Sequence, residues 1–284
     1  MKLINLYKGY ETVFNIKKSV LDRQDAWVEF MSKDINVRQQ CIDDYIEQGL
    51  DWKEVSLNSV FIYDKKFVDR MNRASVLLER IVLDMRSKLS SFYKLELEDT
   101  IIVIYHGLGN AAGWATTYEG KPAIYLGVEK IVELGWDSKS KLEDLVSHEY
   151  GHLVHMDIRK ESLEPFTDFR RKMIYRTYTE GVATYCESIY NGREISSPMW
   201  YQEAIKKEEL LKKEFMRRLD SESENITDFF GDWYPVLGLI EAGYFLGLNV
   251  IKSLLKTLSI VEVMSLDIED VELEVMKYIT DNNL

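Results

Sequence analysis

The sequence His148-Glu149-Tyr150-Gly151-His152 places two histidines four residues apart. Residues at this spacing lie on one face of an α-helix, one turn apart, so a helical backbone would carry both imidazoles to the same point in space. The flanking sequence favours a helix, because Ser140 and Glu143 form a capping-box pattern and apolar residues recur at helical spacing. The apolar residues are Leu142, Leu145, Val146, Leu153 and Val154. We therefore predict a helix from Ser140 to about Arg159.

The spacing of His148 and His152 suits a bound zinc ion, which imidazole nitrogens approach to about 2.0 to 2.1 Å. Glu149 follows the first histidine directly, so it would lie beside the metal rather than on it and could take a proton from a metal-bound water. A catalytic zinc also needs a third protein ligand and an open fourth position for water. The pattern therefore predicts a single Zn²⁺ cofactor and directs the search to a further ligand.

A carboxylate on the next predicted helix, residues 166–190, is the best candidate for the third ligand. Glu180 lies in Thr179-Glu180-Gly181-Val182-Ala183-Thr184-Tyr185, where Gly181 and Ala183 would let two helices approach closely. Glu187 lies seven residues later on the same face and competes with Glu180, although we expect it to hydrogen-bond a ligating imidazole instead. Thr184, one turn after Glu180, could serve that second role too.

The other two histidines are weaker candidates. His155 follows His148 by seven residues, and three ligands on one straight helix would strain a tetrahedral site. We expect His155 to support a ligand or to face the substrate. His106 stays among the candidates for stabilising the oxyanion of a reaction intermediate, together with Tyr178, Tyr234 and Tyr244.

The HExxH segment and Glu180 together resemble the active-site residues of a known group of enzymes. A HExxH segment followed by a glutamate on the next helix is similar to the gluzincin zinc metallopeptidases, and the wording Glu-Gly-Val-Ala resembles bacterial predicted zinc-dependent proteases. The resemblance covers roughly residues 100–250. It departs from the best-known members at Thr184, where they have an aspartate, and in the 27 residues between His152 and Glu180.

The resemblance implies a zincin-like arrangement: a sheet whose edge strand binds extended substrate, an active-site helix, and a helical lobe with the glutamate ligand. The edge would be residues 113–117 or 122–126, near small residues that let a substrate backbone approach. The segment Gly243-Tyr244-Phe245-Leu246-Gly247 is similar to a tyrosine-bearing segment of related proteases, which makes Tyr244 the leading candidate for the oxyanion donor.

Hydrophobic periodicity predicts a mostly helical α+β fold. Apolar residues recur at helical spacing from residue 16 to about 90, and the β-branched run 100–105 then begins a small sheet. Residues 114–118 and 122–127 follow as two more strands across a turn, so the sheet is expected to be antiparallel, or mixed. Helices account for the rest. We expect an N-terminal helical region, 1–95, and a zincin-like metalloprotease domain, 96–284, with one continuous domain as the alternative.

Charge and cysteine content restrict the partners and the setting. The formal net charge is −12, so the electrostatic attraction of a basic surface to nucleic acid or anionic membranes is missing. Two cysteines are too few for a disulfide framework at this length, and a reducing, cytoplasmic setting fits best. The long apolar stretch 234–251 is broken by Glu241 and Asn249, which favours a buried helix over a membrane span.

Together these patterns predict a zinc-dependent hydrolase that cleaves peptide bonds in a peptide or protein substrate. Two alternatives remain open. The first is a metal-binding or interaction protein that has lost turnover, and the second is a zinc hydrolase that acts on a nonpeptide substrate. The sequence does not fix the cleavage preference or the oligomeric state.

Overall fold

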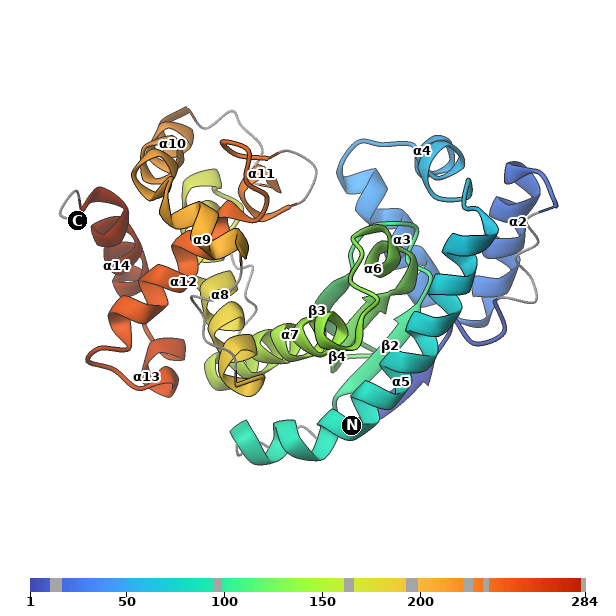
Figure 1. Ribbon diagram of the computed structural model, residues 1–284, viewed down its shortest axis with the longest axis horizontal. Coiled ribbons are helices and arrows are strands. Elements are labelled where there is room, and N and C mark those ends of the chain that lie inside the picture. The colour runs from blue at the N-terminus through green and yellow to red at the C-terminus, as the bar shows by residue number, and fades with distance from the viewer. Residues whose placement is uncertain are drawn as a thin grey trace. The chain divides into compact units, whose positions relative to one another are not determined.

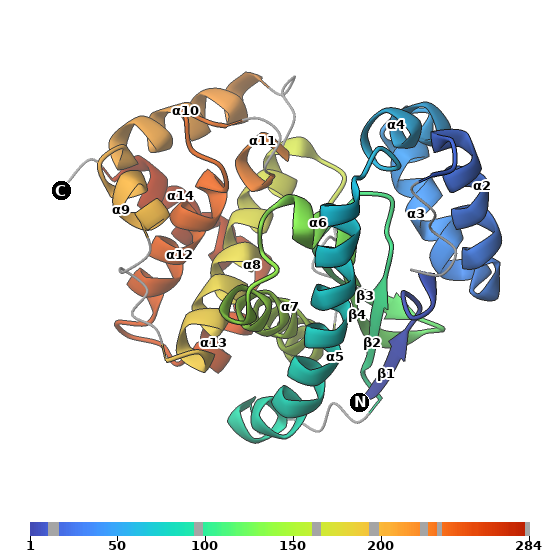
Figure 2. The same cartoon turned by 45° about the vertical axis from the view of Figure 1, so that its right-hand side comes forward.

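The computed structural model describes residues 1–10, 17–93, 99–160, 166–192, 199–221, 227–231 and 235–281. The chain divides into two compact units, Met1–Glu149 and Tyr150–Leu284 (Figures 1 and 2). The division falls inside a single helix, α7, which spans Lys139–Arg159. The fold is α+β and mostly helical, as the periodicity predicts.

The first unit combines helices with a four-stranded sheet. Its elements are β1 (Lys2–Asn5), α2 (Val20–Phe30), a 3₁₀ turn (Met31–Lys33), α3 (Ile35–Glu47), α4 (Trp52–Ser59), α5 (Lys65–Tyr93), β2 (Ile101–Tyr105), β3 (Gly113–Tyr118), β4 (Lys121–Gly127), α6 (Val128–Glu133) and the first half of α7. The three predicted strands form within one residue of the expected bounds. In Figure 2, α5 runs across the sheet, against which it packs.

The sheet is mixed, with the strand order β1-β2-β4-β3. β1 and β4 both run parallel to β2, whereas β3 pairs antiparallel with β4 across the predicted turn. Every residue of β2 is buried, which explains its continuous apolar sequence. No local pattern predicts β1, because Lys2 is exposed, the other three residues are only half-buried, and the pairing partner, β2, lies about a hundred positions away.

The N-terminal helices hold the loop 106–112, which connects β2 to the edge strand β3. Trp27 Nε1 on α2 donates to the carbonyl of His106, and Tyr45 on α3 donates to the carbonyl of Leu108. Asn110 Nδ2 donates to Asp44 Oδ2 at 2.8 Å and to the carbonyl of Cys41 at 2.9 Å. Glu129 Oε1, from α6, accepts from the main-chain amide of Gly109 at 2.8 Å. The start of β3 is thereby fixed by contacts from three helices.

Asp44 makes this contact at a cost in stability. Burial raises the pKa of Asp44 from 3.8 to about 6, even though the hydrogen bond from Asn110 lowers it. Because the folded-state pKa lies above the unfolded value, stability is lost as the pH rises from about 4 through 6.

Asp44→Asn keeps a side-chain oxygen that can accept the hydrogen bond from Asn110. We therefore expect this variant to raise the free energy of unfolding at pH 7 by about 1 kcal/mol after allowance for solvent screening. Near pH 4 the gain should vanish. Urea denaturation at both pH values measures this, and an equal gain at both would contradict the assignment.

The second unit is helical. Its elements after α7 are α8 (Phe169–Tyr190), α9 (Met199–Ile205), α10 (Glu208–Ser221), α11 (Thr227–Phe230), α12 (Ala242–Leu254), α13 (Ile260–Met264) and α14 (Ile268–Thr280). α8 begins where the Asp168 side chain accepts from the amide of Arg171, and it ends as predicted at Asn191, followed by the left-handed Gly192.

Two local expectations are corrected. α7 begins at Lys139, before Ser140, which the capping-box pattern places at the start of the helix, and the Ser138 hydroxyl accepts from the amide of Lys141 at 3.4 Å. Residues 200–219 carry opposite charges four positions apart, which predicts one solvated helix, but they form α9 and α10 with a turn at residues 206–207. Lys212 on α10 is buried over the Tyr278 ring, so this face is only partly solvated.

Of the apolar stretch 234–251, the part from Ala242 onward lies in the buried helix α12, whereas residues 235–241 form turns and a short bridge and residue 234 lies outside the described residues. Within the part of the chain that the structure describes, no helix combines the length and hydropathy that crossing a membrane would require.

Candidate metal centre

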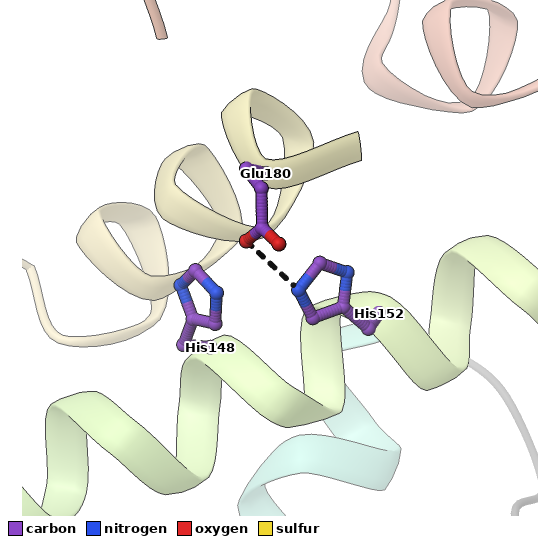
Figure 3. A group of neighbouring side chains, drawn as sticks. All are labelled: His148, His152 and Glu180. Atoms are coloured by element: carbon purple, nitrogen blue, oxygen red, sulfur yellow. Dashed lines mark hydrogen bonds and ion pairs between the residues drawn. The ribbon is translucent and has the colours of Figure 1, made fainter. Parts of the chain in front are cut away.

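His148, His152 and Glu180 come together as the sequence predicts (Figure 3). One potential ligand atom from each side chain lies within 4.8 Å of the others. His152 Nε2 and Glu180 Oε2 are 3.2 Å apart. The two histidines extend from successive turns of α7, and Glu180 reaches them from α8. These residues form a possible metal-binding group.

Small residues permit the close approach of α7 and α8. A Cβ added at Gly151 would lie 3.0 Å from Cys186 Cβ and 3.1 Å from Ala183 Cα. The two helix backbones therefore approach each other at Gly151, inside the HExxH segment. Ala183 is the small residue that permits this approach on α8, as the sequence predicts. Gly181 has a different partner, because a Cβ there would lie 2.4 Å from the main chain of Gly247 on α12. Gly181 thus lets α8 pack against α12, not against α7.

Glu149 lies beside the first residue of the edge strand. It is 6% exposed, and a Cβ added at Gly113 would lie 2.5 Å from Glu149 Oε1 and 2.7 Å from Leu145 Cδ1. Only a glycine leaves room for this carboxylate. Because β3 is the last strand in the sheet order, its outer edge has no neighbouring strand in the described sheet. The carboxylate next to the histidine pair therefore lies beside the start of the last strand of the described sheet.

The two carboxylate oxygens of Glu180 face different partners. Oε2 is directed to His152, whereas Oε1 lies 3.6 Å from Nε of Arg176, one helical turn earlier. The Arg176 guanidinium lies over the Phe230 ring, 5.4 Å from the centroid. The site predicted from the sequence does not include Arg176. The four-residue spacing to Glu180 is the signal that could have singled it out.

The roles expected of Thr184, Glu187 and Tyr244 beside the metal ligands remain predictions. The Thr184 hydroxyl donates to the main-chain carbonyl of Glu180 at 2.8 Å, a contact within α8. Glu187 is half-buried near the end of α8 and is not part of the gathered group. Tyr244 is half-buried at the start of α12, with its ring 6.2 Å from that of Phe230.

The other candidate donors lie in different surroundings. The Tyr178 hydroxyl is buried and donates to the carbonyl of Val263. Tyr234 falls outside the described residues. His155 is fully buried with its ring against that of Tyr178, and burial lowers its pKa from 6.5 to about 3. His106 is buried in the first unit, 3.8 Å from Glu129, and burial lowers its pKa as well.

A scan against protein-family models finds no match for this chain, and searches of curated proteins and of solved structures find no significant similarity.

Proposed function

We propose that this protein is a zinc-dependent hydrolase that cleaves peptide bonds, with His148, His152 and Glu180 as the metal ligands. The observation that carries the proposal is the gathering of these three side chains while Glu149, the intervening acid, lies beside β3, the last strand of the described sheet. The HExxH spacing and the glutamate on the following helix support the gluzincin type of metallopeptidase.

The donor set fits zinc better than the harder divalent cations. Two imidazole nitrogens with one carboxylate oxygen are a common ligand set of catalytic zinc sites, whereas Mg²⁺ and Ca²⁺ prefer sites made of oxygen atoms alone. Three protein ligands also leave a fourth position for water. Among the described residues, no fourth His, Cys, Asp or Glu belongs to the group, as a catalytic rather than a structural site requires.

A zinc ion bound here would polarise the substrate carbonyl and lower the pKa of its water toward about 7. Glu149 would take a proton from the attacking water and pass it to the leaving amine. Its low exposure keeps the carboxylate away from bulk solvent, and Gly113 leaves room for it. An extended peptide could add to the outer edge of β3 through main-chain hydrogen bonds, which would place a peptide bond near Glu149. Tyr244 is the proposed donor to the oxyanion.

The test is cleavage of a mixed peptide library, read by mass spectrometry, before and after metal removal with a chelator. We expect the untreated protein to cleave peptides, the metal-free protein to be inactive, and added Zn²⁺ to restore cleavage. Bound zinc without cleavage of any peptide would favour a noncatalytic metal-binding protein. Hydrolysis confined to a panel of nonpeptide amides, esters or epoxides would favour the other alternative.

A further inference from the structure

The position of Arg176 carries an inference about how Glu180 binds metal. Both residues lie on one face of α8, and the ion pair between them uses Oε1 of the carboxylate. The other oxygen, Oε2, is the one directed to His152. A carboxylate can bind a metal through one oxygen or through both. A cation that pairs with Oε1 leaves only Oε2 for the metal.

Arg176 is itself held in place by an aromatic platform. Its guanidinium lies over the ring of Phe230, which is 5% exposed at the end of α11. The ring in turn packs directly on the backbone of Gly243, where an added Cβ would lie 2.2 Å from Phe230 Cε1. The glycine thus permits Phe230 to support the arginine, and the Arg176 side chain remains only 29% exposed. A cation on an aromatic face gains roughly 0.5 to 2 kcal/mol.

We propose that Arg176 is a positioning residue that restricts Glu180 to one-oxygen coordination. The inference rests on the proposed metal site but not on peptide cleavage. The ion pair of Arg176 with Oε1 keeps the coordination number of the metal low and leaves room for water. It also lowers metal affinity, because a cation next to a ligand repels the bound ion.

The test uses the cobalt(II)-loaded protein, since visible absorption of Co²⁺ is intense at four-coordinate sites and weak when the coordination number rises. Arg176→Met keeps an aliphatic side chain beside Phe230 but loses the positive charge and the N–H donors of the guanidinium. We expect its visible absorption to weaken, because Oε1 is free to bind the ion. In competition with a chelator, its affinity for Zn²⁺ should rise about tenfold, on the order of what one unit charge exerts on a divalent ion across several ångströms.

Two further variants make the test specific. Arg176→Lys keeps a cation near Oε1 and should resemble the wild type. Arg170→Met removes a cation elsewhere on α8, where its partner is Asp220, and should also leave the spectrum unchanged. An unchanged spectrum or weaker zinc binding in Arg176→Met would overturn the role of Arg176. Failure of the wild type to bind cobalt or zinc would instead overturn the metal site itself.

Discussion

Glu149→Gln is expected to abolish peptide hydrolysis while leaving the bound metal in place. Glutamine has the size of glutamate but cannot accept a proton from water, and a general base contributes about 10²- to 10⁴-fold to such reactions. We expect kcat to fall by about 10³-fold or more. Zinc content should stay at the wild-type level, because the ligands assigned here are His148, His152 and Glu180.

The matched control for this variant is Glu143→Gln, six residues earlier on α7, where the carboxylate is part of an ion pair with Lys139. It should retain wild-type kcat. Steady-state kinetics on a cleaved peptide, together with elemental analysis of each protein, would measure both quantities. Full activity of Glu149→Gln would remove this residue from the role of base.

Gly113→Ala should have the next largest effect. The added methyl group would lie 2.5 Å from Glu149 Oε1 and 2.8 Å from Glu149 Cγ, so the carboxylate must move. The end of a flexible side chain yields more easily than backbone does, and we therefore expect the fold and the metal content to survive. Displacement of a reacting group by about 1 Å can cost on the order of 10²-fold in rate, and we expect kcat to fall by about that factor.

Thr117→Ala is the control on the same strand, because Thr117 is exposed at the other end of β3. It should leave kcat unchanged. Melting temperature and zinc content measured beside the kinetics would separate a displaced base from a damaged fold. A Gly113→Ala protein with wild-type kcat would show that the carboxylate does not act from its position beside β3.

The core of the candidate site was predictable because its determinants are local. Helical periodicity places His148 and His152 on one turn, and the segment around Glu180 reads as the next helix. The turn at Gly120 and the stop at Gly192 likewise have clear local signals, since both glycines adopt the left-handed conformation that favours glycine.

The remaining features depend on contacts between residues far apart in the sequence. β1 forms because Lys2–Asn5 pairs with β2, and no short-range pattern marks that pairing. The need for glycine at position 113 arises only when α7 packs beside β3. Gly181 illustrates the same limit: sequence correctly marks it as a close-packing site but assigns it to the wrong neighbouring helix, because the partner, Gly247, lies on α12.

Elemental analysis of the purified wild type beside Glu180→Ala and Glu187→Ala would show whether His148, His152 and Glu180 hold a zinc ion. We expect one zinc ion per chain in the wild type and in Glu187→Ala, and loss of zinc in Glu180→Ala. A wild type without zinc, or loss of zinc only in Glu187→Ala, would contradict the proposed ligand set.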